Sequence, residues 1–405
     1  MNFLKNEINH FKSLPQKARD LLVSYFYFGA TYPLIGTFIN AFIWRKQGDI
    51  ISLAFYNIGN TVALPISFYL NGLLLKRFKI THLYFIGALI TALIPITVVF
   101  FPKSSVWSYL IFGLLFGTGY GLYWANRNYL TFKQTESHNR NYFLGLNFSL
   151  NMITGIVVPL IAGWFIFLAS KFNIISLSQS YQITILFAFV LLFLSGLMVV
   201  KDEYQSPSIS HITIKKITKR WLAVRMLCVS IGVIEGISLF FPTLLILTKL
   251  GAENILGSFN ALIALISSFL IYYYGRKALF HHQKPTLLTT VILGLIAAFI
   301  FGLFFNSLTT IIYLVINSLA IEFMWLTSGP LMMNIMDEEK KIEGQNSYAL
   351  IFDKELFLDL GRMLSFGILF IFITNFGQES ALRFSPVFVY FLQLLLVSFA
   401  WNRLK

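Results

Sequence analysis

Two isolated carboxyl groups are the side chains of this 405-residue sequence best suited to chemistry. Glu235 stands in the run Val-Ile-Glu-Gly-Ile and Glu322 in Leu-Ala-Ile-Glu-Phe-Met-Trp, and neither has a basic residue within its own apolar run. Burial away from water disfavours an uncompensated charge. Each acid is therefore a candidate for carrying a proton or for balancing a cationic group of a ligand. The alternative is a permanently protonated acid that hydrogen-bonds to a neighbouring helix.

Charged residues gather a second time near residue 359. Glu355, Asp359 and Arg362 are spaced four and three residues apart, so a helix would place them on one face. A gate at the cytoplasmic end of a helix, or a structural ion-pair network, explains this pattern. Direct proton coupling, or anion binding by Arg362, is the alternative.

The first half of the sequence has no acid within an apolar run, and its polar candidates are neutral or aromatic. Tyr32, Asn57, Tyr120 and Trp124 are the candidates for contact with a ligand. Tyr120, Trp124 and Arg127 follow helical spacing, so one face could present rings to a ligand, although packing between helices explains the same spacing. We expect Arg127, at the end of its run, to reach the cytoplasmic surface.

The composition identifies the elements that must position these residues. Only 12% of the residues are charged, 57% are apolar, and the mean hydropathy is +0.72. A soluble domain carries about a quarter of its residues as charges, so a soluble enzyme is excluded. A membrane-spanning helix needs about 20 apolar residues. The sequence has twelve such runs, at about 21–44, 51–75, 82–101, 106–130, 142–168, 182–200, 222–248, 254–274, 286–305, 309–336, 348–375 and 384–401.

Several chemistries are not expected from this sequence. The single cysteine, Cys228, excludes an internal disulfide, and the histidines fall at loops or helix ends, so we expect no metal site and no cofactor. No phosphate-binding Gly-x-x-x-x-Gly-Lys-Ser/Thr loop is present, so we do not expect ATP hydrolysis.

The basic residues predict an orientation. With the N-terminus in the cytoplasm, 23 of the 31 Lys and Arg residues fall on the cytoplasmic side and six on the other side. This bias follows the positive-inside rule. It predicts a multi-pass protein of the cell membrane with both termini cytoplasmic, and it explains the net charge of +14 without nucleic acid as a partner.

The longest polar connection divides the chain. We expect a cytoplasmic segment at 1–20, a six-helix bundle at 21–200, a basic linker at 201–220 and a second six-helix bundle at 221–405. Residues 1–20 form either a surface helix or a frayed tail. Two related helical repeats are a recurring design of transporters.

With these features the sequence resembles the major facilitator superfamily. Beyond the helix count and the 6+6 division, the fourth run is rich in glycine, and Arg140 and Gly145 match the family's Arg-x-x-x-x-Gly. The resemblance implies an all-α membrane protein in which two six-helix bundles surround a central cavity. It also implies that Glu235 and Glu322 face this cavity at mid-depth.

A small-residue motif in the fifth run is similar to the Gly-Pro-x-x-Gly-Gly motif familiar from exporters of this family. Gly155, Pro159 and Gly163 recur every four residues and form one stripe, in which Val158 replaces the first glycine of the motif. Small residues allow helices to approach closely. Plain packing and a moving seam between the two halves both explain the stripe.

The resemblance implies a secondary transporter of a small organic solute that works as a monomer by alternating access. Proton-coupled efflux is the favoured mode, and nutrient uptake by proton symport is the alternative. A membrane-embedded lipid-processing enzyme and a transport-inactive sensor are less well supported. The first lacks a second cluster of acids or metal ligands, and the second has only 1–20 as an extra-membrane segment.

Overall fold

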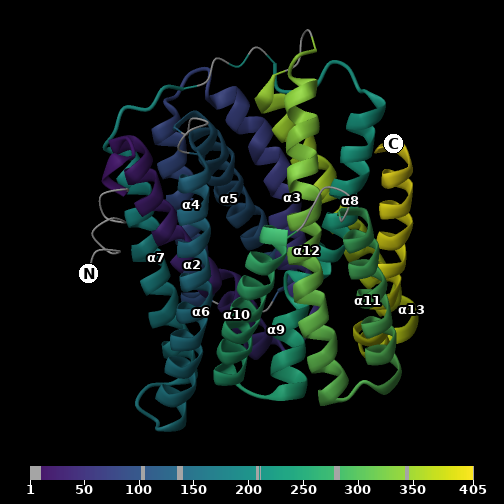
Figure 1. The fold of residues 1–405 in the computed structure, drawn as a ribbon. Coiled ribbons are helices and arrows are strands. Elements are labelled where there is room, and N and C mark those ends of the chain that lie inside the picture. The colour runs from purple at the N-terminus through teal and green to yellow at the C-terminus, as the bar shows by residue number, and fades with distance from the viewer. Residues whose placement is uncertain are drawn as a thin grey trace.

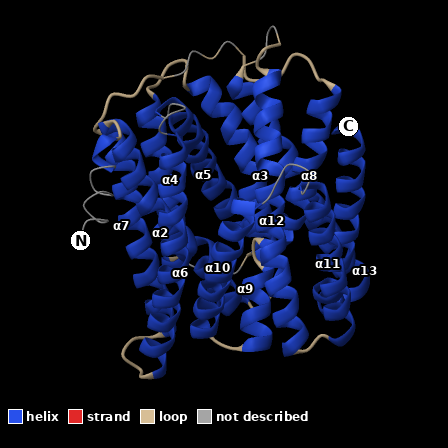
Figure 2. Ribbon diagram, viewed as in Figure 1, coloured by secondary structure: helices blue, strands red, loops and turns tan. Residues whose placement is uncertain are grey.

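The structure is a computed structural model that describes residues 11–101, 105–134, 140–206, 209, 211–277, 283–342 and 346–404. These residues are almost entirely helical and form no strand (Figure 2). Of the expected N-terminal segment 1–20, residues 1–10 lie outside the described residues, and the first long helix begins at Gln16.

The helices run back and forth across the molecule in chain order (Figure 1). The first six are α2 (Gln16–Gln47), α3 (Ile50–Leu74), α4 (Ile80–Phe100), α5 (Val106–Gln134), α6 (Arg140–Lys171) and α7 (Leu177–Val200). The remainder are α8 (Lys219–Ser238), α9 (Phe241–Leu245), the π-helix η1 (Ile246–Leu250), α10 (Glu253–Lys277), α11 (Gln283–Phe304), α12 (Ser307–Glu339) and α13 (Ser347–Leu404).

Two stretches of the chain are not single straight helices. The segments α8, α9 and η1 follow one another and together make one span, 219–250. Helix α13 bends sharply at Gly377, whose φ of 82° and ψ of 171° are not helical, so its two arms form two further crossings. Because a left-handed φ is accessible to glycine at little cost, Gly377 permits this turn. Counted in this way, the described residues contain twelve crossings, which confirms the expected fold class.

Several helices begin at a polar residue whose side chain accepts a hydrogen bond from a free backbone N–H group. Asp49 accepts a hydrogen bond from Ser52 N at the start of α3, and Thr218 accepts one from Trp221 N at the start of α8. At α7, Ser176 and Gln179 form a reciprocal capping box. These caps explain why the spans begin where they do after short polar connections.

Helix packing arranges the spans around a common centre. In the first half, α3 packs on α5, α4 packs on α5 and α7, and α2 packs on α6 and α7. In the second half, α13 packs on α8 and α11, and α11 packs on α12. The two halves meet where α6 contacts α10 and where α3 contacts α13. We call the end at which 201–218 joins α7 to α8, at the top of Figure 1, the linker side.

The stripe in α6 faces the other half. A Cβ atom added at Gly163 would meet the Glu253 carbonyl oxygen and would lie 2.9 Å from Gly257 Cα, both of α10. A Cβ atom added at Gly155 would lie 3.7 Å from the nearest atom, Ala264 Cβ, which is an ordinary contact. The two helices are therefore in backbone contact at Gly163 and more loosely packed at Gly155.

This difference predicts opposite effects for two matched substitutions. Gly163→Ala should destabilise the packed state by about 1–3 kcal/mol, because the added methyl group meets backbone atoms that cannot turn aside. Gly155→Ala should be neutral, or stabilising by about 0.5–1 kcal/mol, because alanine favours the helix and has space. Thermal unfolding of the detergent-purified variants measures both. Equal effects at the two positions would contradict the packing described here.

Candidate functional site

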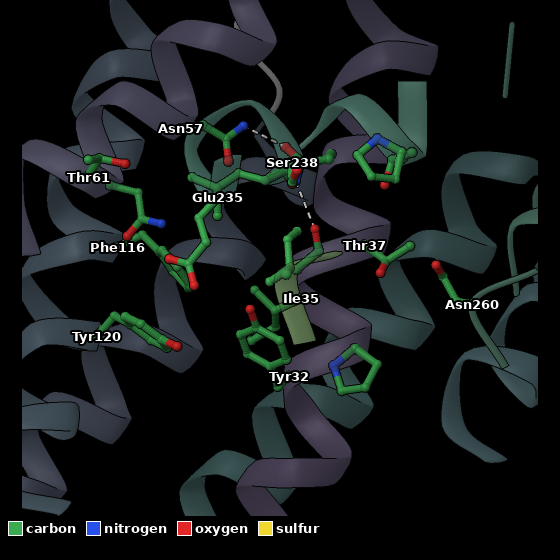
Figure 3. A pocket seen from close by; sticks show the side chains of 18 of the residues that line it. Tyr32, Ile35, Thr37, Asn57, Thr61, Phe116, Tyr120, Glu235, Ser238 and Asn260 are labelled. Atoms are coloured by element: carbon green, nitrogen blue, oxygen red, sulfur yellow. Dashed lines mark hydrogen bonds between the residues drawn. The ribbon is translucent and has the colours of Figure 1, made fainter. Parts of the chain in front are cut away.

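A central cavity lies between the two halves. Its volume is about 450 Å³, which is within the range of small-molecule sites. Helices α2, α3 and α5 of the first half and α8, α10, α12 and α13 of the second half contribute side chains to its wall. Glu235, Tyr32 and Tyr120 approach the same space from three different helices (Figure 3).

Close backbone contact between α8 and α13 positions one charged group of the wall. A Cβ atom at Gly232 would meet the Leu358 carbonyl oxygen, and one at Gly361 would meet the Val229 carbonyl oxygen. Because these glycines let the two backbones touch, Glu235 of α8 and Arg362 of α13 lie directly opposite one another. Helix-to-helix contact thus brings together two residues that are 127 positions apart.

Arg362 binds two carboxylates at once. Its Nη2 and Nε atoms donate to Glu235 Oε2 at 2.6 and 3.1 Å, and its Nη1 atom donates to Asp359 Oδ1 at 2.5 Å. The other oxygen of Glu235, Oε1, accepts from Trp325 Nε1 at 2.6 Å. Charge-assisted hydrogen bonds of this kind are among the strongest in proteins. One cation therefore neutralises one of two acids, and this group of four side chains is tightly held.

Glu322 of α12 lines the same cavity but lacks such compensation. Its side chain is exposed to the cavity and makes no hydrogen bond or ion pair with any residue that the structure describes. The two isolated acids of the sequence thus share one cavity wall, but they differ in kind. Glu235 is paired with a cation, whereas Glu322 is available to a proton or to a ligand.

The remaining charges near residue 355 form two further ion pairs, closer to the linker side. Arg225 donates to both oxygens of Asp353, at 2.8 and 2.6 Å, and Trp221 Nε1 donates to the same carboxylate at 2.7 Å. Glu355 is 4% exposed and pairs with Lys354 at 3.3 Å, and it does not line the cavity. Of the three residues that helical spacing places on one face, Asp359 and Arg362 form an ion pair, and Arg362 lines the cavity whereas Glu355 does not.

Of the neutral candidates of the first half, some line the cavity and one does not. Tyr32, Asn57 and Tyr120 line the cavity, and Asn57 Nδ2 donates to Asn40 Oδ1 at 2.8 Å. Trp124 does not line it; its ring stacks behind that of Tyr120 at a centroid distance of 5.8 Å. Three of the four candidates therefore line the cavity.

Comparison with known proteins identifies the architecture. The model of the Major Facilitator Superfamily matches residues 21–353. The chain belongs to this superfamily. It is a transporter and not an enzyme, and the general activity of the family, secondary transport, is its own.

Relatives of this transporter are similar at moderate identity. It is 25% identical over 342 residues to "Uncharacterized protein YqgE" of Bacillus subtilis (strain 168), covering 82% of this chain and 77% of that protein. It is 33% identical over 133 residues, a third of this chain and 62% of the other, to "Uncharacterized protein in sodM 3'region" of Geobacillus stearothermophilus.

Solved structures show the same fold at low identity. A bacterial homologue of the human lysosomal transporter Spinster, in an inward-facing and occupied conformation, matches with a TM-score of 0.61 and 12% identity, over 95% of this chain and 96% of that one. A POT family transporter in complex with a thioalcohol-conjugated peptide matches with a TM-score of 0.69 and 13% identity, over 98% and 100%.

Two features of the transporter escaped sequence reasoning. Arg127 is 7% exposed and does not reach the surface as expected, because rings from two helices enclose it. Glu253, 3% exposed at the start of α10, accepts from Arg45 Nε at 2.8 Å and from the Tyr181 hydroxyl at 2.9 Å. In a sequence, an acid in the first turn of a helix is explained by its interaction with the free N–H groups of that turn. The sequence therefore gave no reason to expect that Glu253 pairs with an arginine of the other half.

The shared arginine predicts a non-additive pair of substitutions. Arg362→Gln should destabilise the protein by about 3–5 kcal/mol, because it leaves Glu235 and Asp359 without a cation. The double variant Glu235→Gln, Arg362→Gln should recover part of this loss, because it removes one of the uncompensated charges. Unfolding of the single and double variants in detergent completes the cycle. Strictly additive losses would show that the ion pair contributes nothing.

Proposed function

We propose that this transporter exports a small organic solute in exchange for protons, with Glu322 as the proton carrier. The observation that carries the proposal is the uncompensated carboxyl group of Glu322 on a cavity wall that both halves build. A charge inside the membrane is costly unless it is paired or hydrated. Protonation of Glu322 removes that charge and so favours states in which the cavity is closed to water.

Glu235 has a different role in this scheme. Its partner Arg362 holds it in a fixed position, and Trp325 orients its other oxygen. A proton or a cationic group of the solute that reaches Glu235 must compete with Arg362. Once displaced from Glu235, Arg362 would pair with Asp359 alone. Binding at Glu235 of α8 would therefore change the contacts that Arg362 makes in α13. We assign Glu355, outside the cavity, to a gate or structural network on the linker side.

Alternating access requires contacts between the halves that break in turn. Away from the linker side, Arg45 of α2 and Glu253 of α10 form an ion pair at 2.8 Å, in which Glu253 is buried and Arg45 is exposed. On the linker side, the Tyr348 hydroxyl of α13 donates to the Phe68 carbonyl oxygen of α3 at 2.7 Å. We infer that residues 21–200 and 221–405 move as two bodies joined by 201–220, and that these contacts close opposite ends of the pathway.

Export is preferred because the α6 stripe is similar to the exporter motif and lies at the contact between the halves. Proton-symport uptake is the second candidate, since the same two acids serve either direction. The basic residues support placement in the cell membrane with both termini cytoplasmic, and one chain supplies a complete cavity, which supports a monomer.

Replacement of the uncompensated acid should uncouple transport from the proton gradient. A thermal-shift screen of drugs, sugars, amino acids and siderophores at two pH values first selects a compound that stabilises the protein. In proteoliposomes, Glu322→Gln should abolish the uptake of that compound driven by an imposed pH gradient. Exchange of labelled for unlabelled compound should persist, because it needs no net proton movement. Glu379→Gln, at a position 72% exposed, is the control. Gradient-driven transport that survives in Glu322→Gln would exclude Glu322 as the carrier.

The direction of transport is tested with the same compound in vesicles of both orientations. In respiring everted vesicles, an exporter accumulates the compound and a collapsed pH gradient stops it. In right-side-out vesicles, accumulation is expected only for a symporter. Accumulation in the right-side-out vesicles alone would show that the protein takes the compound up and does not export it. The assignment of Glu322 as the proton carrier would not be affected.

A further inference from the structure

Three polar atoms of α3 at the wall of the cavity have no hydrogen-bond partner among the described residues. They are the Tyr56 hydroxyl, the Asn60 Oδ1 atom and the Thr61 hydroxyl, and all three residues line the cavity. Tyr56 is 4% exposed and Thr61 is 1% exposed. Wherever else the described chain leaves a buried side-chain oxygen unpaired, that residue lies outside the cavity wall. The buried unpaired oxygens of the wall therefore belong to a single helix.

Residues of the same types nearby in the first half are satisfied. Thr31 and Thr91 each donate to the carbonyl oxygen four residues earlier, at 2.9 and 2.7 Å. The hydroxyl of Tyr25 donates to the Arg127 carbonyl oxygen at 3.1 Å, and Asn57 Nδ2 donates to two oxygen atoms at 2.8 Å. An unpaired buried polar group costs free energy, so such groups are rare in native structures. The exceptions on α3 therefore call for a partner that the protein itself does not supply.

Close packing holds this part of α3 against α5. A Cβ atom at Gly113 would meet the Tyr56 carbonyl oxygen, and one at Gly117 would meet the Asn60 carbonyl oxygen. Because the two backbones touch, α3 cannot shift toward α5 to pair its polar side chains there. The polar groups of α3 and the adjoining face of α5 therefore form one fixed part of the cavity wall.

Two stacked rings of α5 lie beside these polar groups. The Phe116 ring lies 6.1 Å from the Tyr56 ring, and it stacks on the Tyr120 ring at a centroid distance of 5.8 Å. Phe116 and Tyr120 both line the cavity, on the same side of it as Thr61 (Figure 3). A ring-shaped solute can pack on this apolar surface with its polar substituents directed at α3.

We propose that Tyr56, Asn60 and Thr61 form an uncharged subsite of the cavity, which takes the hydroxyl groups of a ring-shaped solute. A hydroxyl group both donates and accepts hydrogen bonds, and so do the two hydroxyl groups and the amide group on α3. A carboxylate only accepts and an ammonium group only donates, so either would leave part of this set unpaired. This inference rests on the proposed function for the presence of a solute in the cavity, but not on proton coupling or on the direction of transport.

Removal of the unpaired hydroxyl groups should not harm the empty protein. Tyr56→Phe and Thr61→Val keep the shape of the side chains and remove a buried group without a partner, so the midpoint of thermal unfolding should stay the same or rise. Tyr25→Phe is the matched control, and it should lower the midpoint by several degrees because it removes a hydrogen-bonded hydroxyl. A fall as large in Tyr56→Phe and Thr61→Val would show that these hydroxyls have partners within the protein, and it would overturn the proposal.

Binding to the purified full chain, in a detergent without a sugar headgroup, tests the class of solute. The probes are D-glucose, D-galactose, myo-inositol and catechol, and the charged comparison compounds are benzoate and benzylammonium. At least one probe should raise the midpoint of thermal unfolding of the wild-type protein. A response to catechol alone identifies a phenol, and a response to the other probes identifies a sugar or a cyclitol. Stabilisation by none of the four probes, or only by a charged compound, would overturn the proposal.

The double variant Tyr56→Phe, Thr61→Val connects this binding to α3. It should need at least about tenfold more of the stabilising probe, because two hydrogen bonds to the solute are lost. Tyr25→Phe, outside the cavity wall, should need the wild-type amount. If the double variant does not fold, each single variant should need more probe than wild type. An unchanged requirement would overturn the subsite. This binding needs no proton gradient, so it is measured separately from the coupling that Glu322→Gln tests.

Discussion

Compensation of charge inside an apolar bundle is the constraint on which the arrangement of this transporter depends. Arg362 meets part of it by binding Glu235 and Asp359 together, with hydrogen bonds of 2.5–3.1 Å to the two carboxylates. The arrangement is possible only because α8 and α13 touch along their glycines. A side chain at those positions would separate the helices and leave three charges to be hydrated inside the membrane, at a cost of several kcal/mol each.

The two halves meet this constraint by different means. The second half pairs opposite charges, as in Arg362 with Glu235 and Arg225 with Asp353. The first half, which has almost no acids, encloses Arg127 in aromatic rings. The cavity between the halves is therefore asymmetric in its chemistry, with an unpaired carboxyl group on one wall and an aromatic-shielded cation behind the other.

The interface between the halves combines close packing with a few polar contacts. Backbone contact at Gly163 and Gly257 brings α6 and α10 together, and the ion pair of Arg45 with Glu253 lies at the beginning of the same helix α10. A smooth surface of small residues lets one helix slide or separate without large rearrangement of side chains. Polar pairs at the ends can then hold each closed state, because they break when the halves part.

The sequence by itself determined the class of the protein and the number of its spans, because the thickness of the hydrocarbon layer imposes a length of apolar chain that composition alone reveals. It also singled out Glu235 and Glu322, since an acid in an apolar run is conspicuous. Only the tertiary structure decided their partners. Glu235 pairs with Arg362, 127 residues away, and Glu322 has no partner among the described residues. Arg127 was expected at the surface and is buried, since its environment comes from the rings of α2 as well as its own helix. Pairing across helices depends on which faces pack together, and helical spacing within one segment carries no information about that.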